Sequence, residues 1–132
     1  KFWPIKVEDN AFVIVKTGKD VTCQFQVSWT NWKNIFSFEI FGSKGYLNID
    51  GKGGSYGREK LIFGVRPEKF GVPTIQEFEF EGDTSWESEW KNFYRALNKK
   101  GKIIGDGQDG FEANRVIEAI YKSSKLGKII KL

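Results

Sequence analysis

The sequence predicts an α+β fold, with an open, mostly antiparallel β-sheet of about six strands and two helices packed on one face. Segments that alternate apolar and polar residues fill most of residues 10–82, and short glycine-containing links join several of them. Two segments with helical periodicity follow. At 132 residues, 39% of them hydrophobic, the chain suits one domain spanning residues 1–132.

The predicted strands alternate in a way that suggests which side each residue occupies. They cover residues 10–18, 21–29, 35–42, 46–50, 60–65 and 74–82. In the second strand Trp29 continues the apolar side, so we expect its indole in the core. In the last strand Glu77, Glu79 and Glu81 indicate the solvent face of an edge strand. Residues 51–57, rich in glycine, predict a flexible loop.

The predicted helices carry recognisable start and stop signals. The first starts after Thr84, which forms a capping box with Glu87, and Gly101 ends it. The second starts with Asp109 as its N-cap and ends at Gly127. Beyond it, residues 128–132 predict a short closing strand.

Composition excludes several classes of chemistry. The chain has no histidine and one cysteine, Cys23, which argues against a zinc site, a histidine-activated nucleophile and an internal disulfide. A single cysteine fits a reducing compartment, and we expect a cytoplasmic protein. No apolar run is long enough to span a bilayer, so we expect no membrane association.

The charge pattern and the absence of methionine lead to two further expectations. The net charge is +4, but the lysines are scattered among acidic residues and no nucleic-acid-binding motif is present, so we expect no nucleic-acid partner. The chain starts with Lys1 and contains no methionine, which suggests a piece of a longer protein.

Residues 105–110, Gly-Asp-Gly-Gln-Asp-Gly, match the glycine spacing of a dinucleotide-binding turn. The context does not match, because no full strand precedes the turn and no acidic residue follows about 20 residues later. Asp106 and Asp109 would also repel a pyrophosphate at a helix N-terminus. The segment therefore predicts a helix-capping turn, and no cofactor-binding residue is assigned to this chain.

Two groups of residues are candidates for binding, although no catalytic residue or metal ligand stands out. A row of uncharged polar residues along the second strand suggests either ordinary solvent exposure or an oligomer interface, since such groups pair at low desolvation cost. Exposed aromatic and basic residues in the 29–33 turn and the 53–58 loop suggest substrate contacts. The interface row comprises Thr22, Gln24, Gln26 and Ser28, and the substrate candidates are Trp32, Lys33, Tyr56 and Arg58.

The whole chain resembles the C-terminal domain of the glucose–fructose oxidoreductase / inositol dehydrogenase / MocA family. The similarity rests on Asp9-Asn10-Ala11 at the first strand, on Gly42-Ser43-Lys44-Gly45 at a hairpin turn, and on Asp109-Gly110 opening the closing helix. It extends through the sequence IEAIYKSS to Gly127, the most specific part of the match.

The resemblance implies a two-domain enzyme. An N-terminal Rossmann domain would bind NAD or NADP, and this domain would shape the pocket for a small-molecule substrate, usually a sugar, polyol or related compound, and mediate homo-oligomerisation through its open sheet. The family's catalytic lysine lies in a Glu-Lys-Pro motif and its Asp/His pair lies early in the C-terminal domain. Neither is present here: Glu68-Lys69-Phe70 lacks the proline, and histidine is absent.

We therefore expect a C-terminal domain fragment, inactive alone, whose Rossmann domain and catalytic helix lie upstream of Lys1. Two alternatives remain open: a related domain that never had catalytic residues, and a stand-alone carbohydrate-binding or protein-interaction β-domain. Substrate identity, NAD versus NADP and oligomer size do not follow from the sequence.

Overall fold

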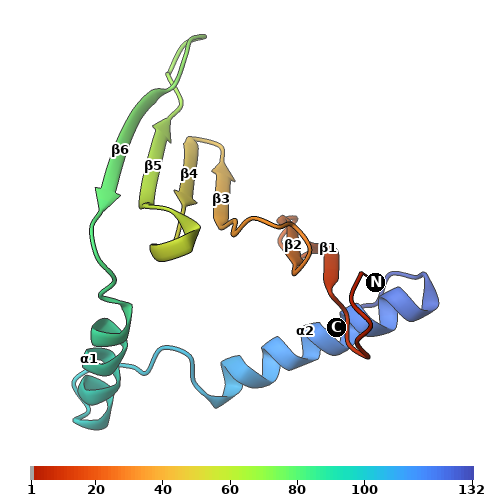
Figure 1. Ribbon diagram of the computed structural model, residues 1–132. Coiled ribbons are helices and arrows are strands. Elements are labelled where there is room, and N and C mark those ends of the chain that lie inside the picture. The colour runs from red at the N-terminus through yellow and green to blue at the C-terminus, as the bar shows by residue number, and fades with distance from the viewer. Residues whose placement is uncertain (1) are drawn as a thin grey trace. The chain divides into compact units, whose positions relative to one another are not determined.

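The computed structural model describes residues 2–132. Six strands and two α-helices form in the order β1 (Asn10–Lys16), β2 (Thr22–Ser28), β3 (Ser37–Gly42), β4 (Gly45–Asp50), β5 (Glu59–Val65), β6 (Thr74–Phe80), α1 (Ser85–Leu97) and α2 (Gly107–Leu126), with a short 3-10 turn, η1 (Gly54–Tyr56), before β5 (Figure 1). The α+β class is confirmed. The six strands divide into two open sheets, one of two strands and one of four.

The chain folds as two compact units. One contains the chain up to Ser28 together with Ser85–Leu132, and the other contains Trp29–Thr84. The first therefore holds β1, β2, α1 and α2, and the second holds β3 to β6 with η1.

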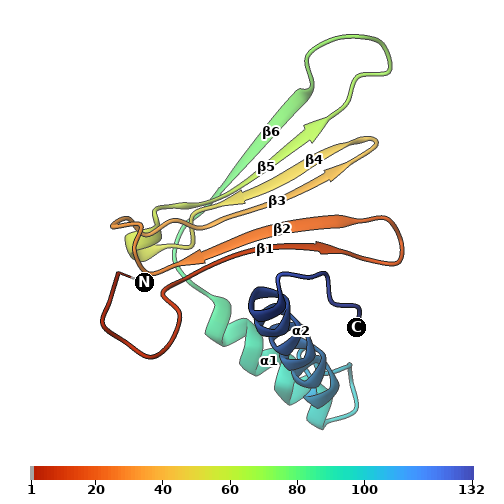
Figure 2. The ribbon, with the colours of Figure 1, turned by 90° about the vertical axis from the view of Figure 1, so that its right-hand side faces the viewer.

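The second unit is an antiparallel meander in the order β3-β4-β5-β6, with β6 at one edge as its acidic row predicted. Figure 2 shows these strands side by side, with the β5–β6 loop extending past the β3–β4 turn. Register separates its two faces, because paired residues on neighbouring strands point to the same side. One face is mainly apolar, with Glu59, Thr74 and Gln76 as its polar residues. Its large apolar residues are Phe38, Ile40, Leu47, Ile49, Leu61, Phe63, Val65, Phe78 and Phe80.

The opposite face of this sheet is polar over most of its length and aromatic at one end. One row across it joins Ser37, Asp50, Lys60 and Glu79, and the next joins Glu39, Asn48, Ile62 and Glu77. At the far end the Tyr46 ring covers Gly64, where a Cβ would lie 2.1 Å from Tyr46 Cε1. Glycine at position 64 therefore leaves the space that the ring occupies.

In the first unit, β1 and β2 form the predicted antiparallel hairpin, paired from Asn10↔Ser28 to Lys16↔Thr22. Asp20 adopts a left-handed conformation in the turn, with φ of 59°, and its carboxylate lies 2.9 Å from the Lys16 ammonium. Trp29, expected in the core, is instead 80% exposed. The reason is that the ladder ends one residue earlier, so no strand partner holds its side chain.

The N-terminal segment is bound to this unit by two carboxylates. Asp9 Oδ2 accepts hydrogen bonds from the backbone nitrogens of Trp3 and Phe2, and these bonds lower the pKa of Asp9 although desolvation opposes them. Tyr121 on α2 donates its hydroxyl to Glu8 Oε2 at 2.8 Å, which raises the pKa of Tyr121. This contact joins residues 113 positions apart in the sequence.

Helix α1 ends at Leu97, four residues before the predicted stop at Gly101. Lys99 takes the left-handed conformation, with φ of 56°. The backbone nitrogen of Lys100 then donates to the Arg95 carbonyl and that of Lys99 to the Ala96 carbonyl, at 2.9 and 3.0 Å. These two bonds make a Schellman motif in which lysine stands where glycine is usual, so sequence alone gave no signal for it.

The end of α2 corrects the prediction for the C-terminus. Gly127 adopts the left-handed conformation that its position predicted, and its backbone nitrogen donates to the Ser123 carbonyl. The Ser123 hydroxyl then donates to the Lys128 carbonyl at 2.7 Å. Residues 128–132 are not a strand, contrary to the prediction, because these bonds direct the chain back to the helix and no strand pairs with it within the described part of the chain.

Candidate functional site

The N-terminus of α2 contains the glycine motif at residues 105–110. The helix starts at Gly107, and its N-cap is Asp106 rather than the predicted Asp109. Asp106 Oδ1 accepts from the backbone nitrogens of Gln108 and Asp109 at 2.9 and 3.0 Å, while Asp109 Oδ2 accepts from the Asp106 nitrogen at 3.1 Å. Asp109 was a plausible N-cap because Glu112 lies three residues later, but the reciprocal bonds form between Asp106 and Asp109, and the Glu112 carboxylate accepts from Gln108 and Arg115 instead.

This cap determines what the helix N-terminus can bind. A pyrophosphate would need the same backbone N–H groups that the Asp106 carboxylate already engages. Gly107 and Gly110 lie inside the helix rather than in a phosphate-binding turn. The glycine spacing is therefore a capping sequence in this structure.

A hollow with both polar and apolar lining residues lies in the four-stranded unit, beside η1. It measures about 330 Å³ and is formed by residues 33–36, Asp50 and residues 55–57. Two of the four predicted substrate residues, Lys33 and Tyr56, line it together. Where a flexible loop was expected, the 3-10 turn Gly54–Tyr56 carries Ser55 and Tyr56 to the hollow.

One hydrogen bond joins the two sides of this hollow. Asn34 Nδ2 donates to Ser55 Oγ at 2.6 Å across 21 residues of sequence. The Gly51 nitrogen donates to the Phe36 carbonyl at 3.0 Å. This bond holds together the two segments that contribute Phe36 and Asp50 to the hollow. The sequence analysis did not predict Asn34, Asp50 or Ser55 as site residues. The only signal for them was that Asn34 is next to Lys33 and Ser55 is next to Tyr56 in the sequence.

The other two predicted substrate residues lie elsewhere. Trp32 is 75% exposed and adopts a left-handed backbone, with φ of 54°, and it does not line the hollow. Arg58 lines a second depression of about 330 Å³, which also contains Phe80, Glu81 and Asp83. The four residues therefore do not converge on one site.

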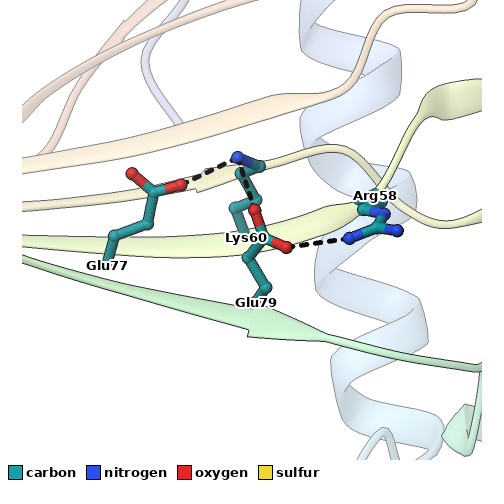
Figure 3. A network of polar contacts seen from close by, with 4 residues as sticks. All are labelled: Arg58, Lys60, Glu77 and Glu79. Atoms are coloured by element: carbon teal, nitrogen blue, oxygen red, sulfur yellow. Dashed lines mark hydrogen bonds and ion pairs between the residues drawn. The ribbon is translucent and has the colours of Figure 1, made fainter.

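Arg58 belongs to a charged network on the polar face of the sheet. Its guanidinium donates to Glu79 at 3.1 Å, and the Lys60 ammonium lies 2.8 Å from oxygens of both Glu77 and Glu79 (Figure 3). The two carboxylates raise the pKa of Lys60, with Glu77 the larger influence. Lys60, and then Arg58, lower the pKa of Glu79.

The predicted interface residues all lie on one face of the two-stranded sheet. Register places Thr22, Gln24, Gln26 and Ser28 opposite Lys16, Ile14, Phe12 and Asn10. Phe12 and Ile14 are each 74% exposed, so this face mixes uncharged polar groups with two large apolar side chains. The alternation within β2 predicted the polar residues of this face. The apolar residues Phe12 and Ile14 are identified only by the pairing of β2 with β1.

Neither a candidate metal site nor a helix that could cross a membrane was found in residues 2–132. No group of three or more Cys, Asp or Glu side chains is arranged to hold a metal ion there. Neither α1 nor α2 has the length and apolarity that crossing a bilayer requires.

Comparison with known proteins gives one match. The family model described as oxidoreductase family, C-terminal alpha/beta domain, matches residues 1–132. No curated protein and no solved structure matches the chain.

Proposed function

The chain belongs to the glucose–fructose oxidoreductase / inositol dehydrogenase / MocA family, as a C-terminal alpha/beta domain, and we propose that it serves an NAD(P)-dependent oxidoreductase acting on a sugar, polyol or related compound. The observation that carries the proposal is the family match over residues 1–132. In this proposal the chain is one domain of a larger enzyme and does no catalysis alone.

The cofactor belongs to an N-terminal Rossmann domain in this proposal. NAD or NADP supplies hydride transfer when bound there, and the residues of this chain contribute binding and orientation. The self-capped N-terminus of α2 supports this division, because the Asp106 carboxylate already accepts from the backbone N–H groups of Gln108 and Asp109. The catalytic lysine and the Asp/His pair expected of the family would likewise lie outside this chain.

We assign substrate contacts to Lys33 and Tyr56, which share the hollow beside η1. Arg58 and Trp32 also remain proposed substrate contacts, although neither residue lines the hollow. Lys33 can donate to a hydroxyl oxygen, and Tyr56, 44% exposed, offers both a hydroxyl and a ring face to a sugar.

We also assign homo-oligomerisation to the mixed face of β1 and β2. Exposed Phe12 and Ile14 beside Gln24 and Gln26 give an apolar centre with polar groups that can pair across a subunit boundary. A cytoplasmic location is part of the proposal as well, and the free thiol of Cys23 is compatible with it.

The reading frame upstream of Lys1 tests the proposal. We expect it to encode a strand, a Gly-x-Gly-x-x-Gly turn and a helix, followed by a Glu-Lys-Pro motif. A natural protein that starts near Lys1 would overturn the assignment to a larger enzyme.

A stand-alone carbohydrate-binding domain is the second candidate, and exposed Trp32 favours it. Sugar-dependent quenching of tryptophan fluorescence that is lost in Trp32→Ala would support this candidate over the first. Unchanged fluorescence at saturating sugar would exclude Trp32 as its platform.

A further inference from the structure

The segment before β1 forms a closed loop around the carboxylate of Asp9. Asp9 is 5% exposed and is the only charged residue that is buried within residues 2–132. Its Oδ2 accepts from two successive backbone nitrogens, those of Phe2 and Trp3, and its Oδ1 accepts from Asn10 Nδ2 at 3.2 Å. A buried carboxylate is stable only where donors surround it, so the burial of Asp9 and the closure of the loop depend on each other.

The loop also has contacts of its own. The backbone nitrogen of Ile5 donates to the Trp3 carbonyl at 2.8 Å, which turns the chain at Pro4. The rings of Phe2 and Trp3 meet edge to face, with centroids 5.1 Å apart. The segment is therefore a compact loop rather than an extended linker.

A second connection joins this loop to α2. The Tyr121 hydroxyl donates to Glu8 Oε2 at 2.8 Å, and both side chains are exposed, Tyr121 by 52%. A single hydrogen bond in contact with water contributes less than the set of bonds on a buried carboxylate. The bond to α2 can therefore break and re-form while the Asp9 bonds keep the loop closed.

We propose that residues 2–9 act as a two-stage strap: Asp9 keeps the loop closed, and the Tyr121–Glu8 bond reversibly fastens the closed loop to α2. The inference rests on the proposed function in one respect, because the polypeptide upstream of the strap is then the cofactor-binding domain. The strap determines where that domain joins the first unit. Glu8, Asp9 and Tyr121 are positioning residues in it, and no chemical step is assigned to them.

Hydrogen exchange of the Trp3 amide, followed by NMR, tests the first stage. Asp9→Ala should speed this exchange by on the order of tenfold or more, because the amide loses its acceptor. Asp9→Asn, which keeps one carbonyl oxygen, should restore part of the protection. Asp20→Asn, which changes an exposed acid in the β1–β2 turn of the same unit, should leave the exchange unchanged. Equal Trp3 exchange in the natural chain and in Asp9→Ala would overturn the proposal, and circular dichroism verifies that each variant folds.

The second stage is tested by Tyr121→Phe. Backbone relaxation should show lower order parameters at Val7 and Glu8, while Trp3 exchange stays within about twofold of the natural chain. Tyr94→Phe removes the hydroxyl of another exposed helical tyrosine in the same unit and should change neither quantity. Unchanged order parameters in Tyr121→Phe, or Trp3 exchange as fast as in Asp9→Ala, would contradict a two-stage strap.

Trypsin applies the same test to the polypeptide that contains its upstream region. Cleavage after Lys6 requires an open loop, so Asp9→Ala should speed it by on the order of tenfold, and Tyr121→Phe by less. Equal cleavage of the natural protein and Asp9→Ala would reject the strap, and normal nicotinamide-linked turnover would then leave the proposed function intact. Asp9-dependent protection in a protein without such turnover would keep the strap and reject the proposed function.

Discussion

Lys60 and Glu79 face each other on β5 and β6, and the Lys60 ammonium nitrogen lies 2.8 Å from Glu79 Oε1. Arg58 approaches the second oxygen of the same carboxylate. Register places Lys60 and Glu79 together, since the two residues are paired in the ladder. The network stabilises the pairing of the edge strand β6 with its neighbour.

This network should make the folded state less stable as the pH falls into the acidic range. Because the folded state lowers the pKa of Glu79 from its ordinary value of 4.5, the stabilisation is present above that value and is lost as the pH falls through the folded pKa. Lys60, whose pKa is raised, keeps its contribution at neutral pH and loses it only under strongly alkaline conditions.

Glu79→Gln should therefore lower the denaturation midpoint at about pH 7 and have little effect at about pH 3. The effect should be small, because the charges are solvent-exposed. Urea titrations at the two pH values measure it. Glu81→Gln, which removes an acid with no ion pair in the described residues, is the control, and an equal effect of the two substitutions at neutral pH would contradict the network's role.

Gly51→Ala should destabilise the four-stranded unit by roughly 2 to 4 kcal/mol. Its φ is 75°, and a Cβ would lie 2.0 Å from the backbone carbonyl oxygen of Arg58, which cannot move without disturbing β5. Gly53→Ala is the matched control, with a similar φ of 71° and nothing within 4 Å of a Cβ, so it should cost only about 1 kcal/mol. Equal losses in chemical denaturation would show that Gly51 has no steric role.

Asp106→Ala should lower the stability of α2 by about 0.5 to 2 kcal/mol, because two backbone N–H groups lose their acceptor. Glu118→Ala, within the same helix, is the control for a change in helix composition. Denaturation followed by far-ultraviolet circular dichroism measures both. A larger loss for Glu118→Ala would contradict the capping role of Asp106.

The mixed face of β1 and β2 gives a prediction about assembly. Gln24→Lys combined with Gln26→Lys introduces two charges beside Phe12 and Ile14 and should shift the oligomer toward monomer by at least about tenfold in dissociation constant. Analytical ultracentrifugation over a concentration series measures the shift. Gln108→Lys, at the exposed start of α2, adds the same side chain elsewhere and should leave assembly unchanged. If the unmodified protein is strictly monomeric, the proposed interface is wrong.

The regular elements were predictable because their signals are local. Alternation placed every strand to within about two residues, and glycine at position 127 correctly marked the end of α2. The errors came from non-local or degenerate signals. Asp106 and Asp109 are equivalent by residue type, the left-handed Lys99 has no sequence mark, and residues 128–132 have strand character but pair with no strand among those described.

The candidate site was predictable only in part. Sequence indicated Lys33 and Tyr56 separately, but the hollow that joins them depends on η1 and on the bond from Asn34 to Ser55. That bond spans 21 residues, and no periodicity encodes it. Arg58 was expected to contact the substrate from the same loop as Tyr56, but its guanidinium donates to Glu79 instead.

Nicotinamide-linked turnover of a panel of sugars and polyols is the most direct test of the central claim, that this chain is the substrate-side domain of an NAD(P)-dependent oxidoreductase. The assay compares the isolated chain with the polypeptide that also contains its upstream region. We expect turnover from the longer polypeptide and neither cofactor binding nor turnover from the chain alone. Cofactor binding by the isolated chain, or a longer polypeptide that binds neither NAD nor NADP, would contradict the account.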